Sequence, residues 1–161
     1  SFSTGTVTST GLSIGGLVGN CGEPGSTCAQ RIENCYTTAT VNGGTLGTWV
    51  GGLVGALTNT GWIINCYSIG KPTGGNYIGG FMGGMVSSLN LSNNNFWDTQ
   101  TSGTSSSGGD GGIYQVGTNS LPPQGRTTAQ MKTQSTYTGW DFVGETANGT
   151  NDYWTINNSL N

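Results

Sequence analysis

Short apolar runs bounded by glycine, asparagine and threonine follow one another along most of the chain. Thr4–Thr8, Thr38–Val41 and Tyr77–Phe81 are typical, since each is rich in β-branched or aromatic residues and too short for a helix. The glycines between the runs suit tight corners and close approach of neighbouring backbones. The pattern therefore predicts short β-strands joined at corners.

One phrase recurs along the chain. Gly-Gly-Leu-Val-Gly occupies residues 15–19, returns at 51–55, and returns as Gly-Gly-Phe-Met-Gly at 79–83. The repeat positions to which we assign a structural role are Gly15, Gly16, Leu17, Val18 and Gly19, then Gly51, Gly52, Leu53, Val54 and Gly55, then Gly79, Gly80 and Phe81.

A second phrase recurs with a similar period. Asn34-Cys35-Tyr36 returns as Asn65-Cys66-Tyr67, and Asn95-Phe96-Trp97 keeps an asparagine and an aromatic residue. Tyr36, Tyr67 and Trp97 are about 30 residues apart, and Phe2 stands where an earlier aromatic residue would fall. A period of this length is the signature of stacked units, so we expect equivalent side chains to form ladders with a spacing of about 4.8 Å.

The repeats predict an all-β fold, a β-solenoid of about three to four Gly-rich coils, each stabilised by its neighbours. Residues 1–101 are expected to form the solenoid, 102–126 a Gly/Ser-rich loop and insertion, and 127–161 a C-terminal capping segment. In that segment we expect one short helix at 127–132 and short strands at 139–143 and 152–156. The residues expected to cover an open end of the solenoid are Trp140, Phe142, Tyr153 and Trp154.

Composition and charge narrow the class of protein. Of 161 residues, 31 are glycine and 7% are charged, and the formal net charge is −3. With Lys and Arg totalling 4, the chain does not suit nucleic acid. No apolar run approaches the roughly 20 residues of a membrane helix. The chain opens without the basic and apolar regions of a signal peptide, so we expect a processed or excised piece of an extracellular protein.

Cysteine usage also favours an extracellular, oxidising setting. Cys21 and Cys28 flank a short insertion, and Cys35 and Cys66 hold equivalent places in neighbouring repeats. Spacing alone leaves several pairings open. We favour Cys21–Cys28 by loop closure and Cys35–Cys66 by stacking, with free stacked thiols as the alternative for the second pair.

These motifs resemble the GLUG-motif repeats of large bacterial and archaeal surface proteins, including haemagglutinin-like adhesins. Matches to the segment that closes such arrays lie at residues 97–103, 127–131, 139–142 and 154–156. The resemblance implies a β-solenoid with a structural or adhesive role at the cell surface, and it implies no catalytic residue. The loop at 21–28, the stretch at 113–124 and the altered third phrase depart from the pattern.

No catalytic centre is predicted. The chain has no histidine, which excludes Ser-His-Asp and Cys-His arrangements. We expect Asp98 and Asp141, each following a tryptophan, to accept hydrogen bonds from the local backbone. The Gly108–Gly112 stretch holds one aspartate, which suits a flexible loop better than a calcium site. We therefore predict no enzyme activity, no cofactor and no metal.

Two groups of surface residues suggest contact with sugars. Asn90, Asn148 and Asn157 begin Asn-x-Ser/Thr sequons and are candidate glycosylation sites. Aromatic residues stack on sugar rings, although core and ladder positions are their commoner use. The candidates for a glycan-binding face are Trp49, Trp62, Tyr77 and Tyr114.

The expected function is structural, as a building block of a cell-surface layer or a head-to-tail filament. The first coil lacks an upstream neighbour and can gain a strand from another subunit, so the expected partners are copies of the chain itself. The expected subunit contacts are Phe2, Thr4, Thr6 and Val7. The main alternative is an adhesin module that binds surface glycans; a polysaccharide-cleaving enzyme, with two carboxylates facing each other in a groove, is less favoured.

Overall fold

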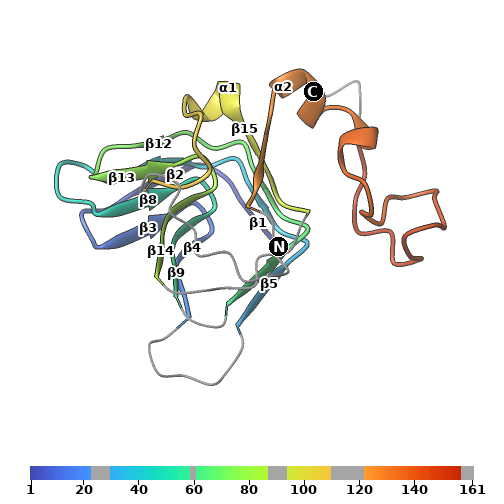
Figure 1. Cartoon of the computed structure of the whole chain (residues 1–161), viewed down its shortest axis with the longest axis horizontal. Coiled ribbons are helices and arrows are strands. Elements are labelled where there is room, and N and C mark those ends of the chain that lie inside the picture. The colour runs from blue at the N-terminus through green and yellow to red at the C-terminus, as the bar shows by residue number, and fades with distance from the viewer. Residues whose placement is uncertain (23–29, 59–60, 87–93, 110–121, 157–161) are drawn as a thin grey trace.

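The computed structural model describes residues 1–22, 30–58, 61–86, 94–109 and 122–156. The chain forms a β-solenoid of about three turns, in which every paired strand is parallel to its partner on the neighbouring coil (Figure 1). This confirms the predicted all-β solenoid.

Each complete coil contributes strands to separate sheets. The first coil holds β1 (Phe2–Ser3), β2 (Thr6–Thr8), β3 (Ser13–Gly15), β4 (Val18–Cys21) and β5 (Arg31–Glu33). The second holds β6 (Tyr36–Thr37), β7 (Thr40–Asn42), β8 (Trp49–Gly51), β9 (Val54–Thr58) and β10 (Trp62–Ile64). The third holds β11 (Tyr67–Ser68), β12 (Pro72–Thr73), β13 (Tyr77–Gly79) and β14 (Met82–Val86). After it come β15 (Phe96–Asp98), α1 (Thr99–Ser102), β16 (Gln124–Arg126), α2 (Thr128–Met131) and the 3-10 turn η1 (Gln134–Thr136).

The sheets stack equivalent strands in register. The longest sheet runs β1-β6-β11-β15-β16 and is called here the aromatic sheet, because Phe2, Tyr36, Tyr67 and Phe96 align along it. Three further sheets run β2-β7-β12, β3-β8-β13 and β4-β9-β14, and a shorter one pairs β5 with β10. Stacking also takes in residues beyond 101, because the N–H groups of Gly80 and Phe81 donate to the carbonyls of Ser106 and Ser107.

The recurring Gly-Gly phrase forms the sharp arch between two strands of the same coil. A methyl group added to Gly51 would lie 1.9 Å from the carbonyl oxygen of Val54 and 2.5 Å from the nitrogen of Gly83. The same clash recurs at Gly15, 2.1 Å from the Val18 oxygen, and at Gly79, 1.9 Å from the Met82 oxygen. The two backbones touch directly, so no residue with a side chain fits at this position.

Apolar side chains between the arches fill two small cores. The larger contains Leu53 and Phe81, the third residues of the repeated phrase, with Ile63, Leu57 and Trp97. The smaller contains Ile14, Val41 and Val50. Leu17, the equivalent of Leu53 in the first coil, is only partly buried because it lies at the open edge of the stack.

The aromatic ladder differs from the prediction at its last member. Tyr67 pairs with Phe96, so Phe96 and not Trp97 continues the ladder. Successive side chains of a strand point to opposite faces, and this register sends Trp97 into the larger core. Trp97 packs there against Gly80, where an added methyl group would lie 2.1 Å from the indole ring. The sequence pattern alone did not show which of the neighbouring residues Phe96 and Trp97 would continue the ladder.

Asparagines shape the corner before the aromatic sheet. Asn34 and Asn65 both have φ of 50°, a left-handed conformation that asparagine adopts more readily than most residues. Asn95 follows the equivalent corner and is fully buried. Its Oδ1 accepts a hydrogen bond from the N–H of Cys66 at 3.0 Å, and its Nδ2 donates to the carbonyl of Ile63 at 2.7 Å.

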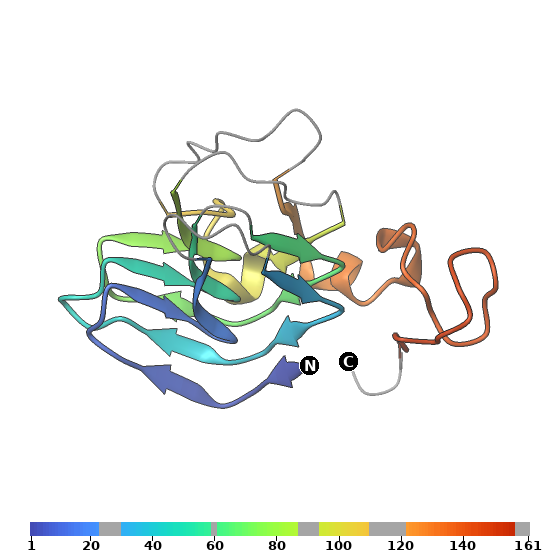
Figure 2. The same ribbon diagram turned by 90° about the horizontal axis from the view of Figure 1, so that it is seen from below.

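The C-terminal segment packs beside the solenoid (Figure 2). The predicted helix is confirmed as α2, with Thr127 and Gln130 forming a capping box. The expected strands at 139–143 and 152–156 were wrong, because only one bridge, Phe142 to Trp154, joins them. The helix α1 was not predicted, although the sequence contains residues typical of both of its ends. Asp98 is the N-cap and accepts from the N–H groups of Gln100 and Thr101, and Gly103 ends the helix at φ 69°.

The predicted capping residues lie in a different place from the one expected. Trp140 and Trp154 pack on the outer face of the aromatic ladder, with ring centroids 6.2 Å and 5.7 Å from Tyr67. Phe142 joins the same cluster, and Tyr153 is exposed. The ladder offers a continuous apolar strip along the side of the solenoid, whereas a coil end presents backbone groups that need strand partners.

We expect Gly51→Ala to destabilise the fold by roughly 3 kcal/mol, because backbone atoms surround the new methyl group and cannot yield. Gly11→Ala is the matched control, since its methyl group would meet only the Ser9 hydroxyl at 3.4 Å. Urea unfolding followed by circular dichroism measures both. Equal stability of the two variants would contradict the arch contact.

Candidate assembly interface

The first coil presents unpaired strand edges. Each of β1 to β5 stands at one end of its sheet and pairs with the second coil on one side only. Backbone groups along β2 point alternately to the two sides of the strand. The carbonyl of Gly5 and the N–H of Ser9 form hydrogen bonds with the second coil. The N–H groups of Thr6 and Thr8 therefore face the open side. Such an edge can bond to a strand of another chain.

An aromatic ring ends the ladder on this open side. Phe2 stacks on Tyr36 with ring centroids 5.1 Å apart and planes 8° apart, and Tyr36 stacks on Tyr67 at 5.0 Å and 5°. Phe2 nevertheless keeps 62% of its surface exposed. Thr4 and Thr6 are exposed and Val7 is half-buried, so the predicted contact residues all lie on the first coil.

The strands of the open edge differ in charge. β1 to β4 contain no charged residue and no proline. β5 carries Arg31 and Glu33, whose side chains form an ion pair at 2.8 Å. Beside it lies a groove of about 500 Å³, lined by Ser1, Leu17, Val18, Arg31, Ile32, Glu33 and Cys35. The edge thus combines an uncharged stretch with a charged corner, which can set the orientation of a partner.

The opposite end of the solenoid is built differently. Pro72, which has no N–H, stands in the outermost strand of the β2-β7-β12 sheet. Ser106–Gly109 cover part of the last coil through hydrogen bonds to Gly80, Phe81 and Gly83. β16 forms the outermost strand of the aromatic sheet. The two ends are therefore not interchangeable.

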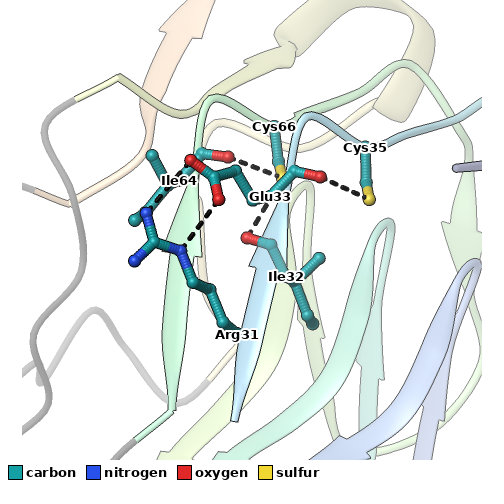
Figure 3. A network of polar contacts seen from close by, with 6 residues as sticks. All are labelled: Arg31, Ile32, Glu33, Cys35, Ile64 and Cys66. Atoms are coloured by element: carbon teal, nitrogen blue, oxygen red, sulfur yellow. Dashed lines mark hydrogen bonds and ion pairs between the residues drawn. The ribbon is translucent and has the colours of Figure 1, made fainter. Parts of the chain in front are cut away.

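Figure 3 shows Cys35 and Cys66 together with the residues whose carbonyl groups accept from their thiols. Cys35 and Cys66 lie on neighbouring coils directly before the paired residues Tyr36 and Tyr67. The Cys35 thiol donates to the carbonyl of Glu33 at 3.0 Å, and the Cys66 thiol donates to the carbonyl of Ile64 at 3.1 Å. Both residues are free thiols in this structure, so the predicted Cys35–Cys66 bridge is not formed. Cys21 is also free, and its predicted partner Cys28 lies outside the described residues.

The two stacked thiols differ in acidity. The neighbouring Cys66 thiol holds the pKa of Cys35 below its usual range. Burial raises the pKa of Cys66, and the neighbouring Cys35 raises it further. Cys35 also lines the groove at the open end, so it is the thiol of the pair that a reagent meets first.

The aspartates make the local hydrogen bonds that the sequence predicted. Asp98 accepts from the N–H groups of Gln100 and Thr101, and its second oxygen accepts from the Thr128 hydroxyl at 2.7 Å. Asp141 accepts from the N–H of Asn151 at 3.0 Å. No group of three or more His, Cys, Asp or Glu side chains with the spacing of a metal site occurs in the described ranges.

The candidate sugar contacts are scattered. Asn148 is exposed, whereas Asn90, Asn157 and Tyr114 fall outside the described residues. Trp49 and Tyr77 are paired neighbours on β8 and β13. Trp62 is exposed on β10, in a different sheet. The sequence did not show that the aromatic residues it singled out would lie on different faces.

No protein-family model, curated protein or solved structure matches the chain. Among the described residues, no helix has the length and hydrophobicity needed to cross a membrane.

We expect mild oxidation with glutathione disulfide to join Cys35 and Cys66. Neighbouring strands of a sheet lie about 4.8 Å apart, within the range that a disulfide bridges. The bridge should raise the free energy of unfolding by roughly 2–4 kcal/mol. Peptide mapping identifies the bridged pair, and thermal unfolding measures the gain.

Cys66→Ser is the control for this experiment, because any stability that it gains on oxidation comes from the pairing of Cys21 with Cys28 and is subtracted from the gain of the unmodified chain. Persistence of two alkylatable thiols at these positions after oxidation would contradict the expected pairing.

Proposed function

We propose that this chain is an extracellular structural protein whose subunits assemble head to tail, as a filament or surface layer, through the open first coil. The observation that supports it is the open edge of that coil in this structure, where β1 to β5 pair with another strand on one side only and the Phe2 ring keeps 62% of its surface exposed. A coil from another subunit would cover both, because it would continue the hydrogen bonding and the aromatic stack.

The direction of the strands favours head-to-tail contact. Strands in every sheet run parallel along the stack. An added coil continues this pattern only if its subunit has the same orientation along the solenoid axis. Such a contact joins two different surfaces, and repeated without closing a ring it produces a filament.

The open edge also lacks the usual protection against pairing. Proteins commonly place lysine or proline on exposed edge strands to prevent association. β1 to β4 have neither, whereas Pro72 stands at the other end of the stack. This difference supports a first coil that is kept available for a partner.

Composition supports an extracellular setting. The chain is rich in glycine and poor in charged residues, and its repeats resemble the GLUG-motif repeats of surface proteins. That resemblance favours a structural or adhesive role, and the open strand edge of the first coil supports the structural one.

The test is the oligomeric state of the purified chain over a range of protein concentrations, measured by light scattering and electron microscopy. We expect fibres with a regular axial step. Phe2→Lys should block elongation, because it breaks the ring stack and adds a charge at the edge. The fold should persist, since 62% of the Phe2 surface is exposed.

Val143→Lys is the matched control for charge and loss of an exposed apolar side chain, because Val143 is 60% exposed on the C-terminal segment. It should assemble like the unmodified chain. A monomer at every concentration would contradict the proposal, as would a discrete dimer, which would indicate a twofold contact.

The extracellular setting has its own test in material from the native source. We expect the peptide that contains Asn148, the exposed sequon, to carry the additional mass of a glycan. Peptide mass spectrometry with and without an N-glycan-cleaving enzyme measures this. An unmodified Asn148 would remove this support without bearing on assembly.

A further inference from the structure

A cavity lies between the aromatic sheet and the C-terminal segment. Its volume is about 330 Å³. Aromatic rings form much of its lining, with Tyr67 contributed by the solenoid and four by the C-terminal segment: Tyr137, Trp140, Phe142 and Trp154. The size falls at the lower end of the range for small-molecule sites in proteins, roughly 300–1,000 Å³.

Polar groups also line the cavity. The Asp98 carboxylate is buried, and its two oxygens accept from the α1 backbone and from Thr128. A carboxylate oxygen has more than one acceptor site, so Asp98 keeps capacity for a further hydrogen bond. Lys132 also lines the cavity and forms no ion pair with the described residues. The lining therefore holds one acidic and one basic group.

One buried donor in this lining has no partner. The indole N–H of Trp154 is buried and makes no hydrogen bond, although the residue keeps only 8% of its surface exposed. Its neighbours are satisfied: Trp140 Nε1 donates to the carbonyl of Asn94 at 3.1 Å, and the Tyr137 hydroxyl donates to that of Met131 at 2.6 Å. Buried indole N–H groups normally find an acceptor, so an acceptor on a ligand would complete this cluster.

We propose that this cavity binds a neutral carbohydrate of one or two pyranose rings. A pyranose presents apolar C–H faces that pack on aromatic rings, and hydroxyl groups that both donate and accept. Asp98 would accept from one hydroxyl. The Trp154 indole N–H, which is covered in this structure, would donate to another after a small rotation of the ring. Lys132 would attract an anion, but the buried Asp98 carboxylate would repel it, so a neutral ligand suits the pair better. A purely apolar ligand would leave Asp98 and the Trp154 N–H buried without new partners.

This site is separate from the assembly interface. It lies on the outer side of the aromatic sheet and involves none of the residues of the open first coil. It also differs from the scattered aromatic residues singled out in the sequence, because Trp49, Trp62 and Tyr77 do not line it. Sugar binding and filament formation can therefore succeed or fail independently.

The binding test uses the full chain and four probes: methyl α-mannopyranoside, methyl β-glucopyranoside, N-acetylglucosamine and cellobiose. Saturation-transfer NMR detects contact, and tryptophan fluorescence gives the affinity. We expect at least one probe to bind. Trp154→Phe keeps an aromatic ring but removes the donor, and it should weaken binding about fivefold to tenfold. Trp62→Phe, on an exposed strand far along the sequence, should change nothing.

The unpartnered N–H has a second readout that needs no ligand. Trp154→Phe and Trp140→Phe remove the same ring area from one cluster, but only Trp140 loses a hydrogen bond to the protein. We expect Trp140→Phe to lower the unfolding temperature by several degrees more than Trp154→Phe does. Equal losses would mean that the Trp154 N–H already has a partner in solution, which would overturn the role given to it.

Other outcomes also decide the matter. Absence of contact with all four probes at tens of millimolar concentration would overturn the proposal, as would undiminished binding by Trp154→Phe. Binding of the uncharged apolar dye N-phenyl-1-naphthylamine without any saccharide would identify an apolar site instead. Electron microscopy of Trp154→Phe should show normal fibres, which keeps failure of this proposal distinct from failure of assembly.

Discussion

Direct contact between two backbone strands within each coil is the constraint on which the rest of the structure depends. Gly15, Gly51 and Gly79 allow it, because any side chain there would enter the carbonyl of the strand across the arch. A coil folded this tightly has little interior, so two small clusters suffice and only 32% of the residues are hydrophobic. Much of the stability therefore comes from the hydrogen bonds and side-chain ladders between neighbouring coils.

The aromatic ladder links this arrangement to both candidate functions. Residues on the outer face of the aromatic sheet cannot reach the thin interior, so their rings stack on one another along the side of the molecule. The C-terminal segment covers Tyr67 and Phe96 and creates the cavity against them. Phe2 lies at the uncovered end of the same ladder. One row of side chains thus forms a wall of the cavity and part of the open coil edge.

Repetition made the solenoid predictable, because the phrases around Gly51 and Tyr67 report both the period and the residues that stack. The same repetition misplaced the last aromatic position, since a one-residue shift between Phe96 and Trp97 reverses the side-chain direction and only strand register resolves it. The C-terminal segment has no internal repeat, so nothing in the sequence showed that Trp140 and Trp154 would pack on the side of the stack. The cavity depends on that packing and could not be foreseen.

Asn95 brings a consequence for the length of the molecule. Its side-chain amide accepts from Cys66 and donates to Ile63, as the peptide group of a further coil would. At this corner a side chain thus makes the contacts that main-chain groups make between the earlier coils, while the aromatic sheet continues from β15 to β16. Because these two contacts lie at the boundary of the third coil and not between internal coils, whole coils could be inserted or removed before that boundary without altering them. Solenoid length is therefore free to vary in evolution in steps of one repeat.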